Sequence, residues 1–136
     1  MNKDDLRGRT KAFALGVIRL TEALPRSRTA EVIGRQLLRS GTSVGANYRA
    51  ASRAQSQAAM LAKLAIVEEE ADECGYWLEL LVESGIVPAD SVALLQREAS
   101  QLVAITVASR KTLRNNLDGR SRRPSTIVNR QSARDS

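Results

Sequence analysis

The residues best suited to chemistry in this sequence are five arginines that share one side of a predicted helix. They are Arg28, Arg35, Arg39, Arg49 and Arg53. At about 100° per residue their side chains fall within a sector roughly 80° wide, and at about 1.5 Å per residue the row is about 37 Å long. Guanidinium groups bind phosphate oxygens in pairs and displace counterions from nucleic acids. The row therefore predicts a surface that binds the backbone of RNA or another nucleic acid.

Three alternatives to this prediction stay open. The arginines can form an ordinary solvated face, or they can pair with acidic residues of a neighbouring helix. They can also pair with acidic residues such as Glu68, Glu69 and Asp72 on adjacent chains, which would make the protein a homo-oligomeric scaffold with no nucleic-acid role. The row contains no aromatic side chain that could stack on bases, so recognition of particular bases is not expected.

Three polar residues fall on faces that are predicted to be buried. Ser40 and Asn47 lie on the apolar side of the arginine-bearing helix, and Glu70 lies among apolar neighbours on the next helix. Buried polar groups are costly unless they are paired, so we expect these three to form a polar network that sets the register of the helices. A catalytic role for Glu70 is the weaker alternative, because no histidine or second inward-facing acid accompanies it.

The apolar side of the third predicted helix is wider than one bundle core requires. Ile66, Trp77 and Leu81 form a second seam beside the main stripe. Exposed aromatic residues commonly mark contact patches, so the seam predicts an oligomer interface. The alternative is that Trp77 only covers the flank of the bundle.

The composition excludes several classes of enzyme and metal site. The 136 residues include no histidine, which removes Ser-His-Asp and Cys-His nucleophile systems and helical HExxH zinc sites. Cys74 is the only cysteine, so neither an intrachain disulfide nor a Cys-based zinc cluster can form, and we expect a buried thiol there. The sequence therefore predicts no catalytic residue, no metal, no cofactor and no enzymatic activity.

Apolar residues recur at helical spacing in four segments that must position these side chains. The segments cover residues 4–24, 29–54, 57–84 and 91–117, with Ser56 and Asp90 as predicted N-caps of the last two. Pro25 and Pro88 interrupt the pattern. Four such helices bury their stripes most economically against each other, which predicts an all-α, up-down-up-down antiparallel four-helix bundle spanning residues 1–118.

Two glycines lie inside the arginine-bearing helix. Gly41 and Gly45 belong to a glycine-containing stretch that lacks the GKS or GKT ending of a phosphate-binding P-loop and follows no predicted strand. Their spacing of four residues instead predicts the close approach of another helix.

The net charge of +6 is concentrated at the carboxyl end of the sequence. Residues 119–136 carry five arginines and one aspartate and have no apolar period, so they are predicted to be a basic, disordered tail. The first residues alternate charges where a signal peptide would need an apolar run, and no segment approaches about 20 uninterrupted apolar residues. A soluble, cytoplasmic protein without a membrane partner is expected.

Three segments of the chain together resemble a known bacterial family. They are LLRSGTSVGANYRA at residues 37–50, KLAIV at 63–67 and EEADECGYWLELL at 69–81. In this order and at this separation they resemble the bacterial four-helix bundle proteins, also called the 23S ribosomal RNA intervening-sequence proteins, over residues 6 to about 115. The Cys74-Gly75 pair departs from the commoner threonine-containing version of that stretch, and the basic tail is not part of the family core.

The resemblance implies an oligomer and two kinds of partner. Subunits of this kind are expected to assemble as a homopentamer. The family is related to the accessory variability proteins of diversity-generating retroelements, which bind nucleic acid and a reverse transcriptase through basic surface residues. A nucleic acid and a reverse transcriptase are therefore the partners that the resemblance implies, whereas the intervening-sequence branch itself has no established biochemical activity.

Overall fold

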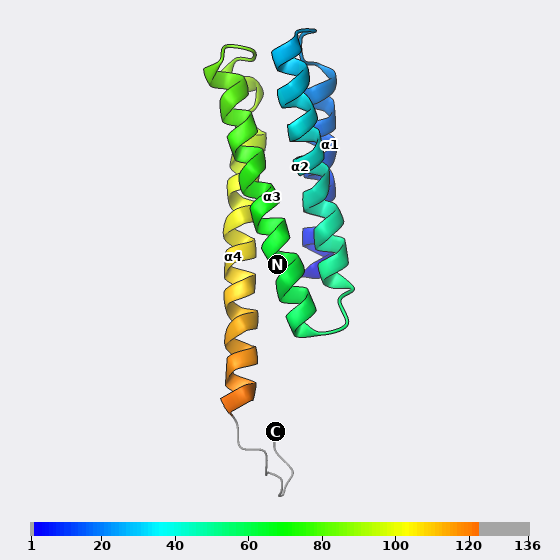
Figure 1. Cartoon of the computed structure of the whole chain (residues 1–136), viewed down its shortest axis with the longest axis vertical. Helices are drawn as coiled ribbons and strands as arrows, with labels where there is room; N and C mark the ends of the chain where they lie inside the picture. Colours follow the sequence, from blue (N-terminus) through cyan, green and yellow to red (C-terminus); the bar gives the residue numbers. More distant parts are fainter. Residues whose placement is uncertain (1, 123–136) are drawn as a thin grey trace, which may run out of the picture.

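Four long helices make up the structure, a computed structural model that describes residues 2–122. They are α1 (Lys3–Glu22), α2 (Arg28–Ser52), α3 (Gln57–Glu83) and α4 (Ala93–Arg122), with the one-turn 3-10 helix η1 (Ala89–Ser91) before α4. Consecutive helices run antiparallel and pack side by side, while α1 touches α4 only lightly (Figure 1). The described residues contain no strand, so the predicted all-α four-helix bundle is confirmed.

Side-chain caps begin the first three helices. The Asn2 side chain accepts a hydrogen bond from the backbone N–H of Asp5 at 2.9 Å, and the Ser27 hydroxyl accepts one from Ala30 at 3.1 Å. The hydroxyl of Ser56 accepts a hydrogen bond from the backbone N–H of Ala59 at 3.0 Å. Such caps satisfy backbone donors that have no partner inside the helix, and the predicted N-cap Ser56 is confirmed.

Both predicted ends of the last helix are wrong. Pro88 opens the short helix η1, which includes Asp90, so Asp90 is not an N-cap and α4 begins only at Ala93. At the other end, α4 continues to Arg122 and crosses the predicted boundary at residue 118. Apolar periodicity shows where a helix packs, and a helix can extend beyond its packed part into solvent. The remainder of the predicted tail, residues 123–136, lies outside the described residues.

The core is mostly aliphatic, with Phe13 and Tyr48 as its buried aromatic residues. Along α4 and just before it, the buried residues are Val92, Ala99, Leu102 and Thr106. Leu95, Ile105 and Ser109 are only partly buried. Because α4 packs mainly against α3 and only lightly against α1, its buried line is turned towards α3.

All four helices are amphipathic rather than uniformly apolar, which fits their packing in a bundle. Among residues 2–122 we find no helix that combines the length and the apolar character needed to cross a membrane.

Glycine allows α1 and α2 to pack closely. A Cβ atom at Gly41 would lie 2.8 Å from Cγ1 of Val17, and one at Gly45 would lie 3.4 Å from the backbone oxygen of Thr10. Val17 is completely buried, so it cannot move aside cheaply. The predicted close approach of another helix is confirmed, and the approaching helix is α1.

We expect Gly41→Ala to lower the free energy of unfolding by about 1–3 kcal/mol, the usual cost of overpacking a tight core. The measurement is urea denaturation followed by circular dichroism. Gly8→Ala is the matched control, because Gly8 lies exposed on α1 and a Cβ atom there would meet nothing within 4 Å. There the better helix propensity of alanine should raise stability by up to about 1 kcal/mol. Equal effects of the two changes would contradict the close approach.

Candidate nucleic-acid interface

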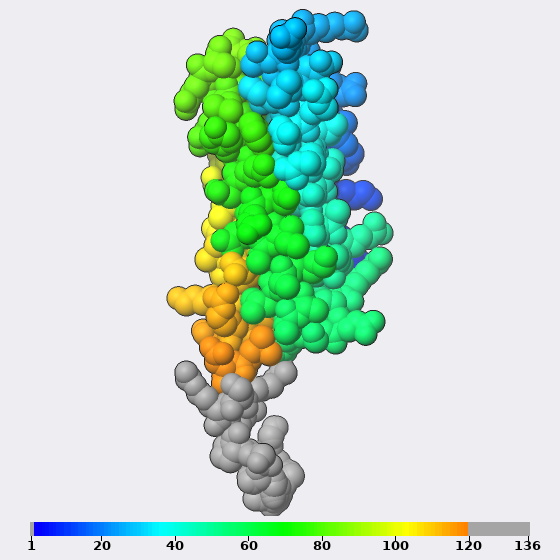
Figure 2. All heavy atoms as spheres, viewed as in Figure 1, coloured from blue at the N-terminus to red at the C-terminus, as the bar shows by residue number. Residues whose placement is uncertain are grey.

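The arginine-bearing face of α2 points away from the bundle core. Leu37 and Val44 are completely buried on the inner side of α2, and all five predicted arginines are exposed on the outer side. In Figure 2 the outer sides of α2 and α3 form one continuous surface, from which long side chains project near the end of α2. Packing of the apolar stripe thus decides which way the arginines face.

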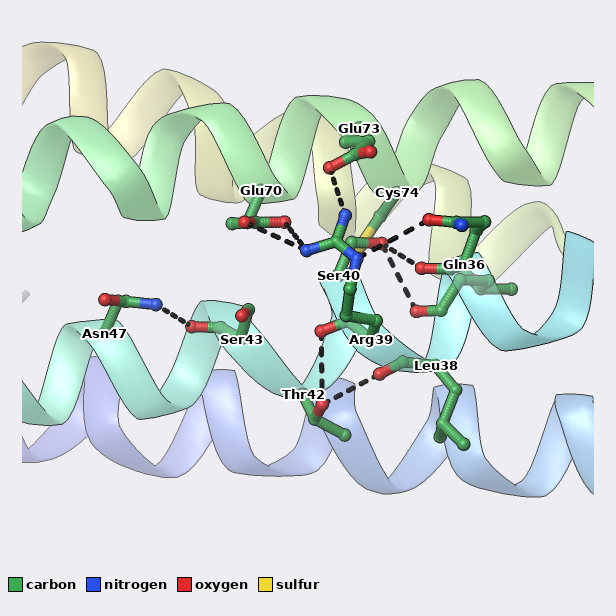
Figure 3. A network of polar contacts seen from close by, with 11 residues as sticks. Gln36, Leu38, Arg39, Ser40, Thr42, Ser43, Asn47, Glu70, Glu73 and Cys74 are labelled. Carbon is green, nitrogen blue, oxygen red and sulfur yellow. Dashed lines mark hydrogen bonds and ion pairs between the residues drawn. The ribbon is translucent and has the colours of Figure 1, made fainter.

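One of the five arginines is paired with carboxylates inside the chain. Arg39 donates to Glu73 on α3 at 2.7 Å and to both carboxylate oxygens of Glu70 at 3.3 Å (Figure 3). No salt bridge within the described residues involves Arg28, Arg35, Arg49 or Arg53. The structure therefore divides the predicted row into one arginine that joins α2 to α3 and four that face solvent, which we call the free arginines.

Electrostatics at the α2–α3 contact reflect this pairing. The hydrogen bond to Glu73, with the charge of Glu70, raises the pKa of Arg39. Burial is the largest cause that raises the pKa of the Glu70 carboxyl, and the neighbouring Glu73 raises it further, so that together they outweigh the lowering effect of Arg39. At Glu73 burial also acts to raise the pKa, but the hydrogen bond and charge of Arg39 prevail, and the pKa is lowered. Glu73 is therefore the main ion-pair partner of Arg39. Sequence reasoning did not identify Glu73, although it lies one helical turn from Glu70 on the same side of α3.

The predicted network of Ser40, Asn47 and Glu70 does not form. The Ser40 hydroxyl donates to the carbonyl oxygen of Gln36 at 3.0 Å, and the Asn47 amide donates to the carbonyl oxygen of Ser43 at 2.9 Å (Figure 3). Each side chain is short enough to be satisfied by its own helix. Glu70 is longer and reaches the surface to meet Arg39. The three residues thus lie along the α2–α3 contact, but no hydrogen bond among the described residues joins them.

Cys74 is confirmed as a buried thiol. It is 0% exposed and donates a hydrogen bond to the Ser40 hydroxyl at 3.3 Å. Burial is the main cause that raises the pKa of Cys74 to about 11. A buried thiol held in its protonated form is a packing residue rather than a nucleophile.

We expect native Cys74 to react at least about 100-fold more slowly with a thiol reagent such as 5,5′-dithiobis(2-nitrobenzoic acid) at pH 8 than in the urea-unfolded chain. A pKa two units higher leaves about 100-fold less thiolate, which is the reactive form, and burial slows access further. Release of the coloured thiolate measures the rate. Because the chain has one cysteine, the signal reports this site alone. A native rate close to the unfolded rate would contradict the buried assignment.

The predicted oligomer interface of Ile66, Trp77 and Leu81 is wrong in one member. Leu81 is 0% exposed and belongs to the bundle core, so it is not available to an adjacent chain. Ile66 and Trp77 are partly buried on the flank of α3. The exposed aromatic side chain of this region is Tyr76, which is 53% exposed and stacks edge-on against Trp77 with the ring centroids 5.1 Å apart.

The three acidic residues that the scaffold alternative pairs with arginines of adjacent chains differ in whether they already have a partner within this chain. Glu68 accepts a hydrogen bond from Arg110 on α4 at 2.5 Å, so it is used within the chain. Glu69 and Asp72 are exposed on α3 and form no ion pair within the described residues. The described part of the chain also holds no cluster of three or more acidic, histidine or cysteine side chains that could bind a metal ion.

Comparison with known proteins places this geometry in a family. No curated protein matches the chain. A solved structure from Bacteroides thetaiotaomicron VPI-5482, described as a protein with unknown function from the S23 ribosomal protein family, is 32% identical to this chain and has a TM-score of 0.76. The match covers 82% of this chain and 99% of that one.

The family model for the 23S rRNA-intervening sequence protein matches residues 4–108, which include α1, α2, α3 and the first half of α4. The match therefore covers both the free arginines and the α2–α3 contact that holds Arg39. On this match and the shared fold, the chain belongs to the 23S rRNA-intervening sequence protein family.

Proposed function

We propose that this protein is a non-enzymatic, oligomeric adaptor that binds the backbone of a nucleic acid, with RNA as the ligand, through the free arginines Arg28, Arg35, Arg49 and Arg53. One observation carries the proposal: three exposed arginines on α2 and Arg53, the residue that follows its last turn, form no ion pair within the described residues. A row of this kind about 37 Å long matches the closely spaced charges of a phosphate backbone.

Arg39 has a different part in this proposal. Its guanidinium is held by two carboxylates of α3, so its positive charge is largely compensated. Binding a phosphate there would require breaking an existing pair of ionic hydrogen bonds. Arg39 therefore positions α2 against α3, and the free arginines make the phosphate contacts.

The test of the proposal uses the full chain as purified. Light scattering before and after nuclease treatment, together with the ratio of absorbance at 260 and 280 nm, reports whether nucleic acid is bound. The proposal expects co-purifying nucleic acid whose removal lowers the mass of the complex. It also expects added RNA to bind with an affinity that falls steeply with salt, because counterions are released on binding. Salt-independent binding, or none at low salt, would overturn it.

A second candidate function is a homo-oligomeric scaffold without a nucleic-acid role. It is favoured by the exposed Tyr76 and by Leu94, which is 75% exposed, and by the unpaired carboxylates of Glu69 and Asp72. Charge reversal at Glu69 and Asp72 should then split the oligomer, and high salt should loosen it. A homopentamer and a reverse transcriptase partner stay predictions. The homopentamer rests on the resemblance to the bacterial four-helix bundle proteins, and the reverse transcriptase rests on the relation of that family to the accessory variability proteins.

A further inference from the structure

A groove of about 710 Å³ lies where the end of α1 meets the beginning of α2. We call it the α1–α2 groove. Its charged lining residues are Glu22, Arg26, Arg28, Glu31 and Arg35. A volume of this size falls in the range of small-ligand sites and is sufficient for one nucleotide. Arg28 and Arg35 are also free arginines, so the groove opens onto one end of the proposed backbone-binding row.

Small and apolar residues also line the groove. Gly34 has no side chain, and a Cβ atom there would lie 3.0 Å from Cδ1 of Leu24, so the glycine lets Leu24 pack closely against α2. Leu24 and Leu38 supply apolar surface in the same groove. A flat, unstacked base can therefore lie against aliphatic carbon while its phosphate stays near the charged rim.

Three guanidinium groups at this groove are available for an anion. Arg26, Arg28 and Arg35 form no ion pair within the described residues, although Glu31 lies one helical turn from both Arg28 and Arg35. The Ser27 hydroxyl accepts a hydrogen bond from one backbone N–H of the first turn of α2, that of Ala30, and the full positive charges at the groove are those of the three arginines. Sequence reasoning missed Arg26, because it precedes the helix on which the row was defined.

Two carboxylates in the same groove favour a ribonucleotide over a deoxyribonucleotide. Glu22 and Glu31 would repel a phosphate, but their carboxyl oxygens accept hydrogen bonds from hydroxyl groups. The ribose 2′-hydroxyl is such a donor, and it is the group by which a protein distinguishes RNA from DNA. A mixed lining of three arginines and two glutamates thus fits a ribonucleotide better than a deoxyribonucleotide.

We infer that the α1–α2 groove holds one nucleotide of a single-stranded RNA. Its phosphate lies against Arg26, Arg28 and Arg35, its ribose hydroxyl donates to Glu22 or Glu31, and its base lies over Leu24 and Leu38. The inference rests on the proposed function, because Arg28 and Arg35 serve both. It adds a site and a preference for RNA that a row of arginines alone would not produce.

The test compares RNA and DNA single strands of one sequence, each carrying a fluorescent label, by anisotropy with the full-length protein at about 50 mM salt. The wild type should bind RNA at least about fivefold more tightly than DNA. Glu22→Ala with Glu31→Ala should bring that ratio close to one, whereas Glu79→Ala with Glu83→Ala, which removes two exposed acids of α3, should leave it unchanged. Circular dichroism checks that both double variants keep their helicity.

A single substitution tests the phosphate contact separately. Arg26→Gln should weaken the binding of RNA and of DNA severalfold, while Arg19→Gln, an exposed arginine of α1 outside the groove, should change neither. If the wild type binds RNA and DNA equally, or if the glutamate variants leave the ratio unchanged, the inference is overturned although the proposed function stands. If the wild type binds neither strand, both fail.

Discussion

Replacing Arg28, Arg35, Arg49 and Arg53 together with glutamine is expected to weaken RNA binding about a thousandfold at about 50 mM salt. Each lost phosphate contact removes a charge-assisted hydrogen bond, for which about 1 kcal/mol net is a conservative value, and about 4 kcal/mol corresponds to nearly three powers of ten. The slope of log affinity against log salt should fall by about three for single-stranded RNA, since each contact contributes about 0.7. Fluorescence anisotropy across a salt series measures both quantities.

A charge-matched control separates these positions from net charge. Lys11, Arg19, Arg97 and Lys111 are exposed on α1 and α4, away from the outer face of α2. Replacing these four with glutamine removes the same charge, so it should leave most of the affinity intact. Arg39→Gln should likewise have little effect on binding, because its charge is already compensated by Glu73 and Glu70. If the variant with Arg28, Arg35, Arg49 and Arg53 replaced by glutamine binds RNA as tightly as the wild type, the proposed function is wrong.

The largest expected effect on stability comes from the core that holds α2 in place. Leu37 is 0% exposed at the centre of the buried side of α2. Leu37→Ala should lower the free energy of unfolding by about 2–5 kcal/mol, the sum of lost hydrophobic transfer and the cavity left behind. Urea denaturation followed by circular dichroism measures the change.

Leu94 provides the matched control for that substitution. It is 75% exposed on α4, so Leu94→Ala removes the same atoms without leaving a cavity. Its effect should stay within about 0.5 kcal/mol, as for other surface changes. A similar loss for both variants would show that Leu94 is covered in solution, which would favour the scaffold over a subunit whose surface is free.

The two candidate functions require opposite solvent exposure of the free arginines of α2. A nucleic-acid adaptor needs its four free arginines to stay open to solvent, whereas a scaffold would cover them with Glu69 and Asp72 of an adjacent chain. Among residues 2–122 these arginines are exposed and neither they nor these acids form an ion pair, so both surfaces are available. Two variants therefore separate the functions. Glutamine replacement of the four free arginines should lower RNA affinity if the protein is an adaptor, and charge reversal at Glu69 and Asp72 should lower the oligomer mass if it is a scaffold.

Sequence alone was sufficient to predict the fold class, the inner and outer sides of α2 and the close approach at Gly41. These features depend on local periodicity and residue size, which a sequence displays directly. The burial of Cys74 was equally predictable, because a lone cysteine among apolar residues at helical spacing lies on a packed face.

Tertiary structure alone decided which partners each polar side chain found. Arg39 of α2 contacts Glu73 and Glu70 of α3, and Ser40 of α2 contacts Cys74 of α3, because the rotation of α3 against α2 sets these contacts. The α1–α2 groove likewise arises only when Arg26 and Glu22 are brought against Arg35 by the turn between two packed helices. Helical periodicity specifies the direction of a side chain around its own axis, whereas a contact depends on the rotation and axial offset of two helices relative to each other.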